Sequence, residues 1–222
     1  MKNPLRERRA GVLLHPTSLP GPHGCGNIGQ DARRFIDFLQ SAGITVWQML
    51  PLGPTHADRS PYQCLSVHAG NTGLICLDDL VAAGWLSPAL AASASLQECL
   101  LAAKTGFAAT ATPAQHKGYA DFRDTHAFWL DAYALYQAIR QSQDNRPWFE
   151  WPAAQRDWQQ AVTLEADHAA AAEQVRFEQY LFFSQWAALH RYARTHGVAL
   201  FGDMPIYVAH DSADVWANPE LF

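Results

Sequence analysis

Three short, largely apolar runs constrain the fold of this chain most. They are residues 10–15, 45–50 and 198–201, and each is followed directly by proline or by Gly-Asp. A run that lacks polar alternation is typical of a strand buried on both faces, as in a parallel sheet covered by helices. The runs therefore predict three strands of an α/β fold.

The segment between the first two runs predicts a helix. Residues 31–43 place Phe35, Phe38, Leu39 and Ala42 at three- and four-residue spacing, which defines one apolar face. Asp31 is expected to cap the start of this helix and Gly43 to close it. Strand, helix and strand then form a βαβ unit with a right-handed crossover.

The third run lies about 150 residues beyond the second, far more than a crossover needs. We therefore expect an insertion between the second and third strands, mostly helical. Residues 78–86, 119–140 and 164–195 predict helices, residues 87–115 carry too weak a pattern to assign, and residues 146–152 predict a loop. The expected division is residues 1–76 for the first two strands and the loop after them, 77–196 for the insertion and 197–222 for the third strand with the loop and helix start after it.

Composition excludes several classes of protein. The 222 residues are 49% hydrophobic and carry a net charge of −5, which predicts a globular protein that binds neither nucleic acid nor a membrane. The N-terminal segment lacks the apolar core of a signal peptide, and we expect a cytoplasmic location. No cysteine or histidine spacing indicates a metal site, and four free thiols are expected: Cys25, Cys64, Cys76 and Cys99.

One motif is misleading. Residues 24–29 (GCGNIG) match the glycine pattern of dinucleotide-binding loops. That pattern requires the first glycine directly after a strand and an acidic residue about 20 positions later, and the chain has neither. We interpret these glycines as positions where a loop approaches other backbone closely.

Polar residues gather after the predicted strands. Ser60, Tyr62 and Gln63 follow the second strand, Asp203 ends the third, and His15 ends the first. The carboxyl ends of parallel strands share one edge, so Tyr62, Gln63 and Asp203 are expected on one rim, where a hydroxyl, a phenol, an amide and a carboxylate suit a polyhydroxylated ligand. A rigid proline turn around Tyr62 and a capping role for Asp203 are the structural alternatives. Other polar residues are interpreted as structural: His56, His68, His210 and the helix start at residues 211–214.

Four ordered motifs carry a resemblance to a known family. They are residues 14–21 (LHPTSLPG), 47–55 (WQMLPLGPT), 60–63 (SPYQ) and 202–216 (GDMPIYVAHDSADVW). Together they resemble the amylomaltase, or disproportionating-enzyme, family of 4-α-glucanotransferases, and the resemblance runs from about residue 10 to the last residue.

The resemblance implies the first three strands of a (β/α)8 barrel and a retaining transfer of α-1,4-glucan segments to a sugar 4-hydroxyl, without a cofactor. Ser60, Tyr62 and Asp203 would then bind the maltooligosaccharide substrate, and His15 is added to these substrate-binding candidates because it ends the first strand on the same rim. Some relatives carry a tyrosine of an outer glucan site where this chain has Ala57.

The resemblance also implies that the nucleophilic aspartate and the acid/base glutamate lie beyond Phe222. The chain is then an N-terminal fragment, expected to be inactive and poorly folded alone because three strands leave open sheet edges. The alternatives are a stand-alone carbohydrate-binding or scaffold module and a hydrolase of the α-amylase clan.

Overall fold

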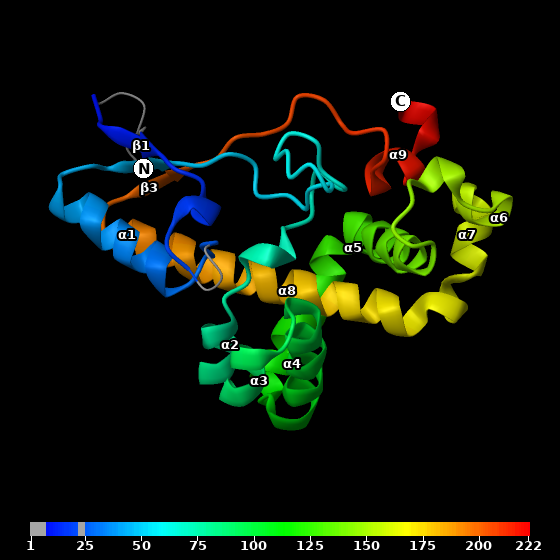
Figure 1. Ribbon diagram of the computed structural model, residues 1–222, viewed down its shortest axis with the longest axis horizontal. Helices are drawn as coiled ribbons and strands as arrows, with labels where there is room; N and C mark the ends of the chain where they lie inside the picture. The colour runs from blue at the N-terminus through cyan, green and yellow to red at the C-terminus, as the bar shows by residue number, and fades with distance from the viewer. Residues whose placement is uncertain (1–7, 22–24) are drawn as a thin grey trace.

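The computed structural model describes residues 8–21 and 25–222, and a small parallel sheet stands at one end of the molecule (Figure 1). Its strands are β1 (Gly11–Leu13), β2 (Val46–Gln48) and β3 (Ala199–Phe201), in the order β1-β2-β3. Both pairs are parallel, as the sequence predicts. Each strand is shorter than its apolar run, although the Leu14 and Met49 amides beyond β1 and β2 still donate to the neighbouring chain at 3.0 and 2.9 Å.

Helix α1 (Gln30–Ser41) connects β1 to β2 and covers the sheet. Its buried stripe is Ala32, Ile36 and Leu39, so the predicted face is only partly right: Phe38 is 58% exposed. The predicted cap is wrong, because Gly29 occupies the N-cap position and Asp31 lies in the first turn. Gly43 does end the helix, with a positive φ of 70° that glycine adopts without strain.

The chain between β2 and β3 is mostly helical, as expected. The weakly patterned residues 87–115 prove to be helical as well, since Ser87 and Ser95 supply side-chain caps that start two helices there. The elements are η4 (Thr72–Leu74), α2 (Leu77–Ala82), α3 (Pro88–Ser93), α4 (Leu96–Thr110), α5 (Pro113–Ser142), η5 (Trp148–Glu150), α6 (Ala153–Arg156), α7 (Trp158–Thr163) and α8 (Glu165–Thr195); η2 (Pro16–Ser18) precedes them, and α9 (Ala213–Ala217) and η6 (Pro219–Leu221) follow β3.

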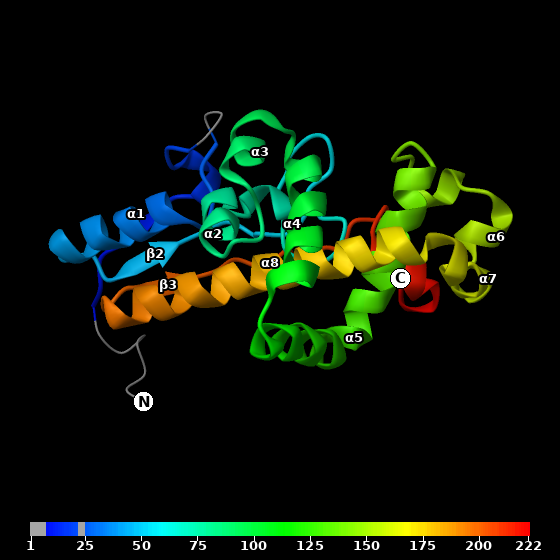
Figure 2. The same ribbon diagram turned by 90° about the horizontal axis from the view of Figure 1, so that it is seen from below.

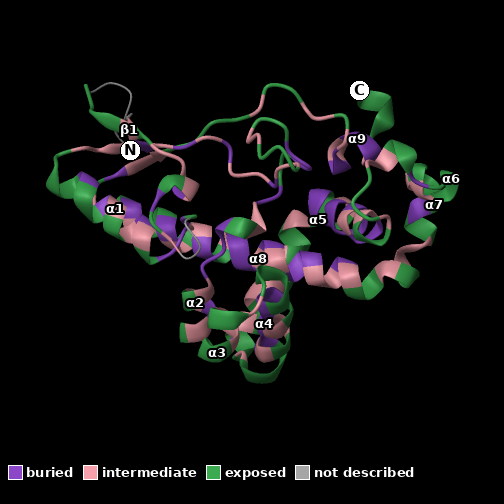
Figure 3. Cartoon of the chain, in the orientation of Figure 1, coloured by how far each residue is buried: buried purple, intermediate pink, exposed green. Residues whose placement is uncertain are grey.

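Helix α8 joins the two ends of the molecule (Figures 1 and 2). Leu189 and Ala193 near its C-terminus pack in the core that surrounds the sheet and α1. Ala172 and Val175 near its N-terminus pack in a second core with α5 and α9. Buried positions therefore follow α8 along its length, whereas the segment after β3 is largely exposed (Figure 3).

Two buried glutamines on α8 hold the chain that follows β2. The Gln179 side chain accepts a hydrogen bond from the Gly70 amide at 2.8 Å and donates one to the Gly70 carbonyl at 3.0 Å. Gln185 makes the same pair with Cys76, at 2.8 and 2.9 Å. Each amide thus satisfies the donor and the acceptor of one residue, as a neighbouring strand would, and fixes the path of this segment on the helix.

Candidate functional site

The segments that follow β2 and β3 meet beyond the carboxyl edge of the sheet. The Tyr62 hydroxyl donates a hydrogen bond of 2.8 Å to Asp203 Oδ2, across 141 positions of sequence. This bond to the carboxylate raises the pKa of Tyr62, because it stabilises the protonated phenol. The contact confirms the predicted meeting of the two residues on one rim.

Further hydrogen bonds tie the two segments together. The Ala213 amide donates to the Leu65 carbonyl at 2.9 Å, and the Val67 amide donates to Asp214 Oδ2 at 3.0 Å. Partial burial raises the pKa of Asp214, and the bond from the Val67 amide offsets part of the cost of the partly buried charge. These bonds lie apart from the Tyr62–Asp203 contact and hold the two segments together at a second place.

Asp203 lies between two hollows. A cavity of about 990 Å³ contains Asp203, Tyr62 and Gln63 together with residues of the 147–149 and 204–211 segments. A smaller cavity of about 420 Å³ lies against the ends of β2 and β3 and also contains Asp203. Volumes of this size accommodate small-molecule ligands.

Several side chains with large apolar surfaces line the larger cavity and are exposed to solvent. Met204, Ile206 and Tyr207 are 77%, 90% and 84% exposed. Tyr62 itself is 46% exposed, so its ring is accessible to a ligand while its hydroxyl is bound to Asp203. The arrangement combines apolar faces with a carboxylate, which suits a sugar.

Asp211 also lines this cavity and links the segment after β3 to α5 and η5. Its carboxylate accepts hydrogen bonds from the Tyr136 hydroxyl at 2.7 Å, from Arg140 Nη1 at 2.6 Å and from the Trp148 amide at 3.1 Å. His56 Nδ1 lies 3.7 Å from the same carboxylate. The sequence predicts only a helix start at residues 211–214; Ser212 does cap α9, but no pattern links Asp211 to α5.

His15 and Ser60 do not share the cavity of Tyr62. His15 Nδ1 lies 2.7 Å from Thr17 Oγ1 and Nε2 lies 3.4 Å from the Pro51 carbonyl, and burial lowers the pKa of His15. It lines a separate cavity of about 780 Å³. Ser60 lies in the turn before Tyr62, where its carbonyl accepts from the Gln63 amide at 3.3 Å.

The described glycines of the motif at residues 24–29 pack against other parts of the chain, as the sequence predicts. Gly26 and Gly29 lie so close to the Pro16 carbonyl and the Cys76 side chain that a Cβ would overlap them, which confirms a loop packed on other parts of the chain. Gly24 of the same motif lies outside the described residues. Within residues 8–21 and 25–222, no helix is long and apolar enough to cross a membrane, and no group of three metal-ligand side chains occurs.

The fold and the rim together define an α/β protein with an open, partly aromatic cleft at the carboxyl edge of a parallel sheet. The family model for 4-alpha-glucanotransferase matches residues 14–222. The chain therefore belongs to the 4-alpha-glucanotransferase family.

Individual relatives agree with this assignment. The chain is 43% identical to the 4-alpha-glucanotransferase of Thermus thermophilus and 40% identical to that of Synechocystis, over 97% and 98% of its length. The structure of amylomaltase from Streptococcus agalactiae in complex with acarbose aligns with a TM-score of 0.90 and 33% identity, over 97% of this chain and 47% of that one. The chain spans about half the length of the curated relatives it matches, 46% in both cases.

Proposed function

We propose that this chain contributes the substrate rim of a 4-α-glucanotransferase that moves segments of α-1,4-glucan to the 4-hydroxyl of glucose or a maltodextrin. The observation that carries the proposal is the Tyr62–Asp203 contact, exposed in a large cavity at the carboxyl edge of the sheet. The family assignment supports it, and so does the acarbose held by the related amylomaltase, since acarbose is an oligosaccharide-like ligand.

Asp203 acts in this proposal as a binding group. Its Oδ2 accepts from Tyr62 and its Oδ1 accepts from the Met204 amide at 2.8 Å, so both oxygens are oriented by the protein. A carboxylate has further lone pairs for the hydroxyls of a sugar. The exposed ring of Tyr62 offers an apolar surface for the pyranose, and Ser60 and His15 would contribute further out.

Retaining transfer needs a nucleophilic carboxylate and an acid/base carboxylate about 5–5.5 Å apart. We assign neither role to Asp203, because its carboxylate is already engaged by Tyr62 and by its own loop. As the family resemblance implies, we place both catalytic carboxylates beyond Phe222. The sugar would be held as a glycosyl-aspartate and then passed to the acceptor hydroxyl, with no metal or organic cofactor.

We further infer that the three strands are the first part of a (β/α)8 barrel, with residues 77–196 as an inserted subdomain. The parallel order β1-β2-β3 supports the barrel. Helix α8 continues without a break from the insertion to the residues just before β3, and its C-terminal part packs in the core around the sheet. This supports counting the C-terminal part of α8 among the helices that cover the barrel strands. The four free cysteines support a reducing compartment such as the cytoplasm.

The test uses the natural full-length polypeptide that carries residues 1–222. Incubated with maltotriose, it is expected to release glucose and form longer maltodextrins. Asp203→Asn should lower kcat/KM by about 100-fold or more while the melting temperature stays close to that of the parent protein. Full transfer by Asp203→Asn, with earlier melting, would make Asp203 a structural residue and overturn the proposal.

A further inference from the structure

A pair of stacked rings stands in the larger cavity that also contains Tyr62 and Asp203. The rings are Phe149 of η5 and His210, with centroids 5.2 Å apart and planes 22° apart. Both side chains line the same cavity as Tyr62 and Asp203. Phe149 is 41% exposed, so a large apolar ring is left in water at the edge of a cavity.

The backbone under this pair is held firmly. Trp148 Nε1 donates to the His210 carbonyl at 2.7 Å, and the Trp148 amide donates to Asp211 Oδ1 at 3.1 Å. Asp211 is in turn anchored to α5 by its 2.6 Å ion pair with Arg140, whose side chain is 11% exposed. An apolar ring on a rigid backbone loses little conformational entropy when a ligand covers it.

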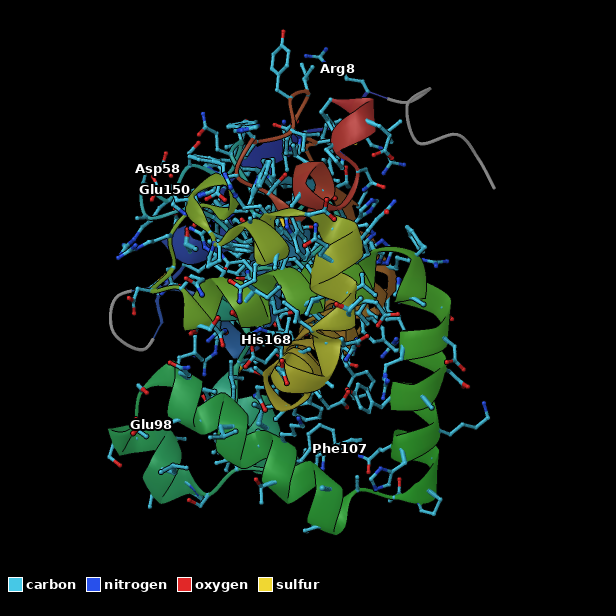
Figure 4. All side chains as sticks on the ribbon, turned by 90° about the vertical axis from the view of Figure 1, so that its right-hand side faces the viewer. Arg8, Asp58, Glu98, Phe107, Glu150 and His168 are labelled. Carbon is cyan, nitrogen blue, oxygen red and sulfur yellow. The ribbon has the colours of Figure 1, made fainter. Side chains whose placement is uncertain are left out.

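Phe149 and His210 lie on the side of the molecule that carries the loop after β2. Figure 4 shows Glu150, next to Phe149 in the chain, and Asp58 of that loop on the same side of the molecule. The cavity therefore extends from the rim to the helical insertion, since it contains both Tyr62 and Phe149.

We propose that Phe149 and His210 form a second sugar-binding platform, which holds glucosyl units of a long α-1,4-glucan beyond those at Tyr62 and Asp203. The proposal rests on the proposed function, because it takes the same glucan as the occupant. A flat ring presents an apolar face to a pyranose, and the exposed, preorganised Phe149 ring fits that contact. The helical insertion thereby sets the preference for chain length.

Phe128 provides a matched control. It lies on α5 of the same helical region, is 75% exposed, and also contacts a histidine, with its ring edge-on to His68 at 5.5 Å. It does not line the cavity of Tyr62 and Asp203. Phe128→Ala therefore removes an even more exposed phenylalanine ring without touching the proposed platform.

The experiment compares kcat/KM for maltoheptaose and maltotriose in the full-length polypeptide. Phe149→Ala should lower kcat/KM for maltoheptaose by about 5–10-fold and that for maltotriose less than about twofold, since a short donor does not reach the platform. Phe149→Trp should retain the parent ratio, and Phe128→Ala should leave both values unchanged.

The outcomes separate the platform from the proposed function. A parent protein that transfers glucan, with Phe149→Ala equal to it or impaired equally on both donors, overturns the platform alone. A parent protein without transfer overturns the proposed function. In that case the affinity for maltoheptaose, measured by calorimetry, tests the platform. A weaker affinity of Phe149→Ala supports the platform, whereas an unchanged affinity, or no binding by the parent protein, refutes it.

Discussion

The Gln179 amide, which pairs with both backbone groups of Gly70, gives a direct test of how the segment that follows β2 is held. Replacing it by methionine keeps the length of the side chain but removes both hydrogen bonds to Gly70. Gly70 is buried, and the ring of Phe182 lies so close that a Cβ there would overlap it. Both backbone groups of Gly70 then lose their side-chain partner.

The magnitude follows from those two groups. A buried donor or acceptor left without a partner costs about 1–3 kcal/mol, and Gln179→Met leaves one of each. The apolar methionine side chain recovers part of this, because the site on α8 is fully buried. We expect a net loss of about 2–4 kcal/mol in the free energy of unfolding.

Urea denaturation of the full-length polypeptide measures this change. Gln159→Met on α7 is the control, since that glutamine is exposed, and it should fall within about 0.5 kcal/mol of the parent protein. An equal, small change for Gln179→Met would refute the reasoning, because the loop would then be held by other contacts.

The same structure supports three further predictions. Asp211→Asn breaks the partly buried ion pair with Arg140 and should cost about 1–3 kcal/mol in urea denaturation, whereas a loss under about 0.5 kcal/mol would deny the anchoring role. Burial lowers the pKa of His15 in the folded protein. As the pH falls below about 6.5, the unfolded chain therefore binds a proton at His15 more readily than the folded chain does, and the free energy of unfolding decreases. His15→Gln should flatten this part of the pH profile of urea midpoints; an unchanged slope would contradict it. Glucan transfer should survive dialysis against EDTA, and recovery only upon adding a divalent ion would show that a metal takes part.

Strand direction explains why part of the site was predictable. Tyr62 and Asp203 follow parallel strands, so the two residues must emerge at one edge, and the hydrogen bond between them agrees with that expectation. The spacing likewise predicts Gly43 as a helix end, and its positive φ agrees with that.

Other features depend on packing that the local sequence does not encode. Asp211 meets Arg140 across 71 residues, and only the docking of α5 beside the segment after β3 brings them together. Helices α3 and α4 escaped prediction because their residues are rich in alanine, which favours helix without marking a buried face. The spacing predicts Phe38 on the buried face of its helix, but Phe38 is exposed and Ile36 is buried instead.

The most direct test of the account is the structure of the full-length polypeptide with bound maltoheptaose. The account predicts glucosyl units in the cavity of Tyr62 and Asp203, with a hydroxyl within hydrogen-bond distance of the Asp203 carboxylate. A glucan bound elsewhere, for example in the separate cavity that contains His15, with Tyr62 and Asp203 free of sugar, would contradict it.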